Sequence, residues 1–122
     1  HAFLQKAIAR ARQNGIDASR IIVDPGIGFG KTIHHNLELI RRLKEFESLN
    51  VPILMGTSRK MFLRKILTGN SGKELDPGSP VVETGTQASV SAAILNGAHI
   101  VRVHDVAGTL ATVKVIDAIK NG

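Results

Sequence analysis

The sequence predicts an α/β fold built on parallel strands, and three observations lead to this prediction. Helical and strand-like patterns alternate along the chain, the strand-like runs are short and wholly apolar, and polar residues follow each run directly. Apolar runs of this kind are typical of strands that are buried on both faces, as in parallel sheets. Strands that alternate with helices are joined by right-handed crossovers. Both a doubly wound sheet and a (β/α) barrel meet these conditions.

The elements are expected in the order helix, strand, helix, strand, helix, helix, strand, helix. The helical segments repeat apolar residues at three- and four-residue spacing. Residues 70–80 are rich in Gly, Pro and Ser, lack any periodic pattern, and are expected to form a surface loop. The expected helices cover residues 3–13, 39–46, 60–68, 84–95 and 110–119, and the expected strands cover residues 21–23, 51–55 and 99–103.

Composition limits the class of protein. Of the 122 residues, 43% are apolar and 21% are charged, so the chain can bury a core and is not disordered by composition. The absence of cysteine excludes disulfides, thiolate metal sites and cysteine nucleophiles. No apolar run approaches the about 20 residues that span a bilayer, and the first residues lack a signal-peptide pattern. A soluble, cytoplasmic protein without membrane contact is therefore expected.

The excess of positive charge favours small anionic partners. The chain has 16 Lys and Arg against 10 Asp and Glu, which gives a formal charge of +6. Such a charge is compatible with nucleic acid and equally with small anions. The only aromatic residues are four Phe, so platforms for stacking single-stranded bases are scarce. We therefore expect small-molecule substrates and no nucleic-acid partner.

Polar residues stand at the ends of all three expected strands. Asp24–Lys31 follows the first strand, Gly56–Lys60 follows the second, and Arg102, His104 and Asp105 lie around the end of the third. Because the carboxyl ends of parallel strands share one edge, these groups are expected to face a single crevice. The cations suit an oxyanion, whereas the first carboxylate can accept two N–H bonds from an amidine-like ring edge.

Each of these residues also has a purely structural interpretation. Asp24 can form a turn, Phe29 can cap the core instead of stacking on a ring, and His104 can be a satisfied histidine at a strand end. Arg102 and His104 share one face of an extended strand, while Asp105 can cap the following helix.

The glycine-rich run does not fit a generic nucleotide site. The motif G-x-x-x-x-G-K-[ST] requires a glycine where Pro25 stands, and in G-x-G-x-x-G the third glycine, Gly30, comes one residue early. Arg59 and Lys60 stand at the expected start of a helix, where each cation opposes the helix dipole by ~0.3–1 kcal/mol. Two such cations indicate that an anion compensates them.

Together, residues 24–31 (DPGIGFGK), 56–60 (GTSRK) and 102–105 (RVHD) resemble the carboxyl-terminal half of the dihydropteroate synthase family of pterin-binding barrels. The resemblance agrees in motif identity, order and spacing, and it covers nearly the whole chain. It implies that residues 1–122 are the carboxyl-terminal half of a TIM (β/α)8 barrel, that its strands are the sixth to eighth, and that the amino-terminal half is absent.

This family of transferases, the sulfonamide target, condenses 6-hydroxymethyl-7,8-dihydropterin diphosphate with 4-aminobenzoate. The products are 7,8-dihydropteroate, for folate biosynthesis, and diphosphate. By resemblance, Asp24 would hold the amino-pyrimidine edge of the pterin, and Lys60 would lie against the pterin. Gly28 and Gly56 would let the backbone approach the ring.

The resemblance assigns the remaining site residues to the second substrate and the leaving group. Phe29 would line the aminobenzoate side of the pocket, Ser58 would contact the aminobenzoate carboxylate, and Lys60 would help to shape that site. Arg102 and His104 would bind the diphosphate. Lys60, Arg102 and His104 are thus the expected catalytic residues.

The resemblance further implies a full-length homodimer and a requirement for Mg²⁺ whose protein ligand would lie in the other half. Because a barrel of this type needs about 200 residues or more, this length alone is not expected to have synthase activity. Two alternatives stay open. One is a pterin- or folate-binding methyltransferase barrel, and the other is a non-enzymatic half-barrel that binds anions.

Overall fold

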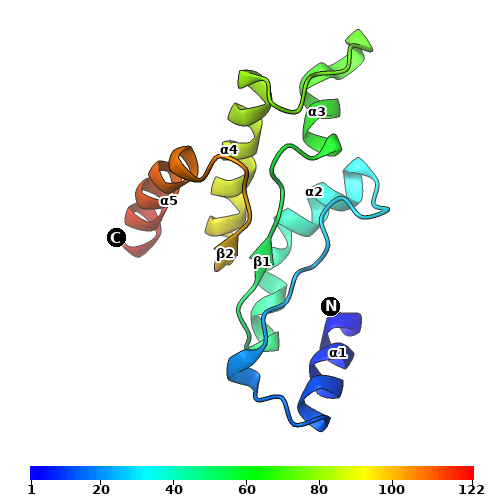
Figure 1. Ribbon diagram of the computed structural model, residues 1–122, viewed down its shortest axis with the longest axis vertical. Coiled ribbons are helices and arrows are strands. Elements are labelled where there is room, and N and C mark those ends of the chain that lie inside the picture. Colours follow the sequence, from blue (N-terminus) through cyan, green and yellow to red (C-terminus); the bar gives the residue numbers. More distant parts are fainter.

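A computed structural model describes residues 1–122 and has the expected alternation of helices and strands (Figure 1). None of the helices is both long and apolar enough to cross a membrane. The elements are α1 (Ala2–Gln13), η1 (Ala18–Arg20), α2 (Ile33–Arg41), η2 (Leu43–Leu49), β1 (Leu54–Met55), α3 (Met61–Thr68), η3 (Gly69–Ser71), α4 (Pro80–Leu95), β2 (Ile100–Val101) and α5 (Val106–Asn121), where η denotes a 3-10 helix.

Three extended segments run parallel in sequence order, as predicted, but each is shorter than expected. β1 pairs with β2, and Met55 lies opposite Val101. The first segment, 21–23, joins β1 through a single parallel bridge between Val23 and Ile53. Each outer segment has a hydrogen-bonded neighbour on one side only. Few backbone hydrogen bonds therefore define each outer segment. The predicted strand 21–23 is reduced to one bridge, and the predicted strands 51–55 and 99–103 are reduced to the short strands β1 and β2.

The core lies where the extended segments meet the helices. α4 packs against α2, α3 and α5, and Figure 1 shows α5 beside α4. Leu4 and Ile8 of α1 pack against the rim of the core. α1 buries none of its residues. Ile53 and Leu43 are fully buried at the centre of the core. The main cluster comprises Val23, Ile27, Ile40, Leu43, Val51, Ile53, Met55, Phe62, Leu63, Ala93 and Ala98.

Capping residues move the helix starts away from the predicted positions. The expected helix 39–46 is wrong, because α2 begins at Ile33 and stops at Arg41, after which η2 continues to Leu49. The Thr32 side chain accepts the His35 backbone N–H at 3.1 Å and so starts α2 early. α4 begins at Pro80, which suits the first turn of a helix because proline lacks the N–H that would be unpaired there.

Asp105 could lie on the opposite face of the strand or cap the last helix, and the structure shows the cap. Asp105 is the N-cap of α5, and its carboxylate accepts the Gly108 backbone N–H at 2.9 Å. This cap turns the chain sharply after β2, so that the helix returns along α4 and the end of β2 stays open to the site.

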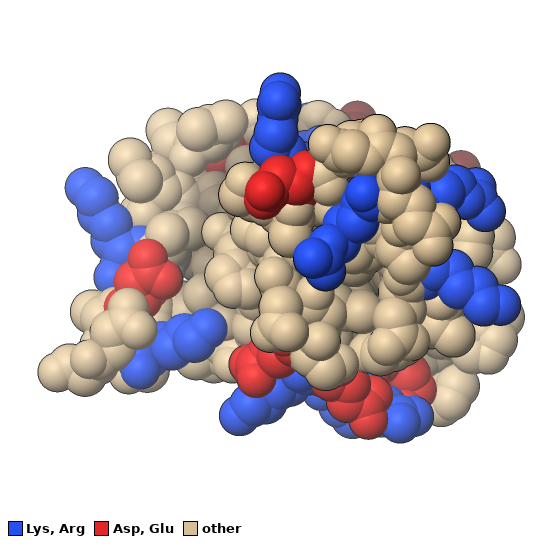
Figure 2. All heavy atoms as spheres, turned by 90° about the horizontal axis from the view of Figure 1, so that it is seen from below, with Lys and Arg blue, Asp and Glu red and all other residues tan.

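Charges are dispersed over the face that Figure 2 shows. Lys and Arg side chains stand apart from one another, with Asp and Glu side chains between them. A continuous basic stripe, which is the usual footprint of a nucleic-acid surface, does not occur on this face.

Truncation of Ile53 tests the placement of the core. We expect Ile53→Ala to lower the free energy of unfolding by about 2–5 kcal/mol, because it removes a fully buried side chain and leaves a cavity. The matched control is Ile22→Ala, since Ile22 is 55% exposed and its loss should cost less than about 0.5 kcal/mol. Urea unfolding of both variants gives the two values, and equal losses would contradict this core.

Candidate functional site

The polar residues that follow the three extended segments meet at one edge of the sheet. Asp24 follows the first segment and Arg102 follows β2, 78 residues later, yet Asp24 Oδ2 and Arg102 Nη1 lie 3.5 Å apart. This ion pair bridges the end of β1. The prediction that side chains from different strand ends face one another is therefore confirmed for Asp24 and Arg102.

Asp24 forms the turn that its sequence position suggested, whereas its expected contact with a ligand ring stays a prediction. Its Oδ1 accepts the Gly26 backbone N–H at 2.9 Å, which forms a turn. Its Oδ2 faces Arg102. The Asp24 side chain keeps 35% of its surface exposed, so the carboxylate can still accept hydrogen bonds from a ligand.

Lys60 crosses from the second strand end to the glycine-rich loop. Its Nζ donates to the Ile27 carbonyl at 2.6 Å and lies 4.6 Å from the centre of the Phe29 ring, within the range of a cation–π contact. A Cβ on Gly28 would lie 2.8 Å from Lys60 Cδ, and Gly28 has a φ of +90°. Only glycine fits there without displacing the lysine.

The pKa of Lys60 lies below its ordinary value of 10.5. Burial of the ammonium group is the largest cause, followed by repulsion from Arg102; Asp24 raises the pKa, and Lys31 lowers it further. An anion near Lys60 would favour its charged form.

Arg102 lies directly against the backbone of Gly56. A Cβ on Gly56 would approach an Arg102 guanidinium nitrogen to 2.6 Å. Gly56 therefore makes room for this arginine, and its expected approach to a ligand ring stays a prediction. Arg102 and His104 are exposed while Val101 and Val103 are half-buried, which is the alternation of an extended strand.

Ser58 and His104 form the second link across the crevice. Ser58 Oγ lies 2.7 Å from His104 Nδ1 and accepts the His104 backbone N–H at 3.3 Å. The hydroxyl oxygen has two lone pairs, so it can accept the backbone N–H and either donate to Nδ1 or accept from it. Ser58 is only 6% exposed. Its expected contact with an aminobenzoate carboxylate stays a prediction, whereas its contact with His104 is formed.

Phe29 does not cap the core. It is 71% exposed, and Lys60 lies over its ring. Of the two interpretations of this residue, a ring-stacking wall fits and a core-capping residue is wrong. Phe29, Lys60, Lys31 and Asn36 help to line a cleft of about 440 Å³ between the glycine-rich loop and α3.

Arg59 does not lie in the first turn of a helix, contrary to the prediction. α3 begins at Met61, and Arg59 precedes it with a φ of +57°, which is strained for a residue other than glycine. Its Nε lies 3.5 Å from Glu83 Oε2. The anion that compensates Arg59 is thus a carboxylate of α4.

Sequence reasoning missed the residues that hold the site loops in place. Asn36 is 2% exposed, and its Oδ1 accepts the Gly28 backbone N–H at 2.9 Å. Thr86 Oγ1 accepts the Arg59 backbone N–H at 3.1 Å, and Ser89 Oγ bonds Thr57 Oγ1 at 2.7 Å. The sequence contained only a weak indication that these polar residues are buried. Each of them lies four positions from an apolar residue on a buried helix face, as Asn36 does from Ile40.

The described residues do not fit a magnesium centre. No three His, Asp or Glu side chains lie close enough together to hold a metal ion. We therefore derive no step through a metal that these residues would bind.

A carboxylate and several cations lie together at the carboxyl edge of a parallel α/β sheet. The sequence profile described as "Pterin binding enzyme" matches residues 1–104. The chain belongs to this family of pterin-binding enzymes.

Relatives and solved structures agree with this assignment. A dihydropteroate synthase of Synechocystis is 44% identical over 117 residues, which cover 96% of this chain and 38% of the relative. That of Escherichia coli is 40% identical over 111 residues, covering 91% and 36%. A structure of dihydropteroate synthase from Xanthomonas albilineans in complex with 7,8-dihydropteroate has a TM-score of 0.88 at 37% identity, covering 100% and 44%. The chain thus spans about two fifths of the length of these proteins.

Removal of the Ser58 hydroxyl tests the assigned hydrogen bond between Ser58 and His104. In Ser58→Ala, Nδ1 loses its hydrogen-bond partner, so we expect the ratio of the two tautomers of the His104 ring to change. The nitrogen chemical shifts of the His104 ring measure this ratio. The control is Ser48→Ala, which removes the partner of the exposed His1 ring and should leave His104 unchanged. An unchanged ratio in Ser58→Ala would disprove the assignment.

Proposed function

We propose that this chain supplies the pterin, aminobenzoate and diphosphate contacts of a dihydropteroate synthase. The observation that carries the proposal is the meeting of Asp24 and Arg102 beside Lys60, at the carboxyl ends of parallel segments. The names of the relatives and of the solved structures support it. The reaction joins the amine nitrogen of 4-aminobenzoate to the methylene carbon of the dihydropterin. The carbon–oxygen bond breaks, diphosphate leaves with the electron pair, and the amine loses a proton.

The pterin edge is assigned to Asp24. An ionised carboxylate accepts two hydrogen bonds side by side, and the amino-pyrimidine edge of a pterin presents two N–H donors in that arrangement. The turn through Gly26 fixes one carboxylate oxygen, so the group is held in place before the ligand binds. The Lys60 side chain, which crosses the loop at Gly28, provides a neighbouring wall for the ring.

The diphosphate is assigned to Arg102 and His104. Arg102 offers guanidinium N–H donors, and Ser58 occupies Nδ1 of His104, which leaves Nε2 to face the diphosphate. Negative charge grows on the diphosphate oxygen as the carbon–oxygen bond breaks. Donors already fixed in position stabilise that charge without further reorganisation. In this assignment Ser58 is a positioning residue for the catalytic His104.

The 4-aminobenzoate ring is assigned to the cleft beside Phe29 and Lys60. An exposed aromatic wall favours an aromatic substrate. A solved structure from Xanthomonas albilineans contains 4-aminobenzoic acid, which supports this substrate. The relatives compared above are named synthases, and this favours synthase chemistry over the methyltransferase and non-enzymatic alternatives.

Four further proposals rest on the family resemblance. We propose that residues 1–122 form the carboxyl-terminal part of a pterin-binding barrel, that the full-length enzyme is a homodimer, that it works in the cytoplasm, and that sulfonamides bind it. A solved relative from Yersinia pestis in complex with a sulfonamide drug supports the last of these.

Asp24→Asn tests the pterin contact. The amide keeps the shape of the side chain but replaces one acceptor with a donor, so one ring N–H loses its partner. We expect the Kd for a 6-hydroxymethyl-pterin to rise about 10- to 100-fold, since a hydrogen bond to a charged group contributes about 1.5–3 kcal/mol. Calorimetric titration measures it. Asp117→Asn, on the exposed side of α5, is the matched control, and equal affinities for the two variants would refute the pterin contact.

Arg102→Ala separates the diphosphate contact from the pterin contact. We expect the Kd of the pterin diphosphate to rise at least about tenfold more than the Kd of the bare pterin, because only the first ligand loses a charged partner. Any indirect effect through Asp24 changes both ligands alike, so the ratio isolates the diphosphate. Arg12→Ala, on exposed α1, should change neither value. Equal losses for both ligands in Arg102→Ala would argue against the assigned role.

A further inference from the structure

The turn that carries Lys60 is held by an ion pair that has no function in the reaction described above. Arg59 Nε lies 3.5 Å from Glu83 Oε2, and this is the least exposed of the four ion pairs in the structure. Both atoms are buried and have no hydrogen-bond partner. Loss of either side chain would therefore leave the buried atom of the other without a compensating charge.

Arg59 has a backbone conformation that a residue with a Cβ disfavours. Its φ is +57°, and Asn50 is the only other residue apart from glycine with a positive φ. Such a conformation persists only where the surroundings hold it. At Arg59 the surroundings are two residues of α4: Thr86 Oγ1 accepts the backbone N–H at 3.1 Å, and Glu83 holds the side chain.

The Glu83 carboxylate is itself fixed by its neighbours. Gln87 Nε2 donates to Glu83 Oε1 at 3.0 Å and lies 3.0 Å from Thr109 Oγ1 of α5. The Thr112 hydroxyl, also on α5, donates to Gln87 Oε1 at 2.6 Å. One carboxylate oxygen is thus held by Gln87, and the other is directed to Arg59.

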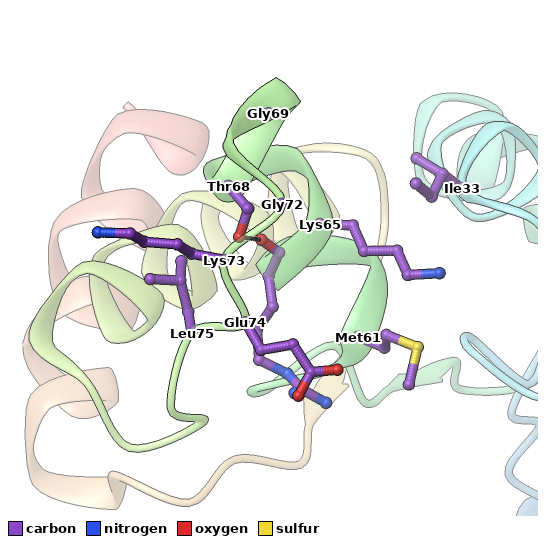
Figure 3. Close-up of a pocket in the computed structure, with 10 residues that line it drawn as sticks. Ile33, Met61, Lys65, Thr68, Gly69, Gly72, Lys73, Glu74 and Leu75 are labelled. Carbon is purple, nitrogen blue, oxygen red and sulfur yellow. Dashed lines mark hydrogen bonds between the residues drawn. The ribbon is translucent and has the colours of Figure 1, made fainter.

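The same turn sets the direction of Lys60 and the start of α3. The Lys60 backbone N–H donates to the Thr57 carbonyl at 3.2 Å, and α3 begins at the next residue, Met61. Met61 and Lys65 line both the 440 Å³ cleft and a second cavity of about 400 Å³ beside α3 (Figure 3). A change in the backbone at Arg59 would therefore displace Lys60 together with this wall of the cleft.

We propose that Arg59 and Glu83 are positioning residues for Lys60, because their ion pair holds the left-handed backbone that directs the lysine across the glycine-rich loop. This inference rests on the function proposed above, in which Lys60 lies against the pterin. Glycine adopts the left-handed conformation without strain, so removal of the Arg59 Cβ should make the pair unnecessary. A role limited to packing against α4 predicts the opposite, since glycine loses more contacts than alanine does.

Two double variants that differ by one methyl group test the inference. Glu83→Gln removes the charge and keeps the size of the side chain, so we expect Lys60 to leave the Phe29 ring in most molecules. Addition of Arg59→Gly should return Lys60 to the ring, whereas addition of Arg59→Ala should not. The ring current of Phe29 shifts the signals of the Lys60 ε-methylene protons, and NMR spectra of the unliganded chain therefore measure its position.

The Kd for a 6-hydroxymethyl-pterin gives the second measurement. We expect it to rise about fivefold in Glu83→Gln and in Glu83→Gln/Arg59→Ala, because the apparent affinity falls with the fraction of molecules that have Lys60 in place. In Glu83→Gln/Arg59→Gly it should return to within about twofold of the wild-type value. Calorimetric titration measures the Kd, and thermal unfolding verifies that each variant is folded.

Two remote substitutions are the controls. Asn50 has the same φ of +57° but precedes β1, whereas Arg59 follows it, so Asn50→Ala introduces strain away from the site. Arg42→Ala breaks an exposed ion pair with Glu45. Both variants should leave the Lys60 shifts and the pterin Kd unchanged.

The outcomes separate this inference from the proposed function. If Glu83→Gln leaves the Lys60 shifts unchanged, or if the glycine and alanine double variants give equal shifts, the positioning role is wrong and the synthase function stands. A pterin Kd that stays constant while the shifts change would also overturn the positioning role. If the wild-type chain does not bind the pterin, the proposed function fails, and the Lys60 shifts alone then decide whether the pair holds the lysine.

Discussion

The parallel alignment of residues 21–23 and β2 on either side of β1 is the constraint on which the site depends. The Leu54 backbone N–H donates to the Val23 carbonyl at 2.8 Å, and the Arg102 backbone N–H donates to the Met55 carbonyl at 3.0 Å. Asp24 follows Val23 directly, so this register places its carboxylate and the Arg102 guanidinium at the same edge. A shift of one residue in either segment would turn one of these side chains to the other face. The ion pair between residues 24 and 102 is thus a consequence of backbone pairing, and the buried Ile53 keeps that pairing in place.

α4 gives the second strand end its shape. The turn from Thr57 to Lys60 includes a left-handed Arg59, a conformation that costs on the order of 1–3 kcal/mol. The hydroxyls of Thr86 and Ser89 bond this turn from behind, and both are buried. The strain is therefore offset by contacts within the core. One result is that successive side chains of the turn point to different places: Arg59 turns to α4, whereas Lys60 crosses the glycine-rich loop.

The positions of the strand ends were predictable because short apolar runs and the polar residues after them are local features of the sequence. Tertiary contacts decide the rest. The local sequence does not indicate that Ser58 contacts His104, which is 46 residues away. It also does not indicate that the exposed Phe29 ring lies beneath Lys60. The start of α2 was missed because the hydroxyl cap at Thr32 lies outside the apolar repeat used to find the helix. Asn36 was missed for a related reason, since a buried polar residue is recognised only once its partner, here the Gly28 backbone, is known.

The electrostatics of the site connect its architecture to its chemistry. Burial and the charge of Arg102 lower the pKa of Lys60, and only Asp24 acts in the opposite direction. The fold therefore places Lys60 partly out of solvent and near Arg102, with Asp24 as the nearby carboxylate that favours its charged form. A bound anion near Arg102 would raise the pKa of Lys60 by direct attraction and stabilise its charged form. In the proposed reaction, cations that are in place before negative charge develops on the leaving group would stabilise that charge.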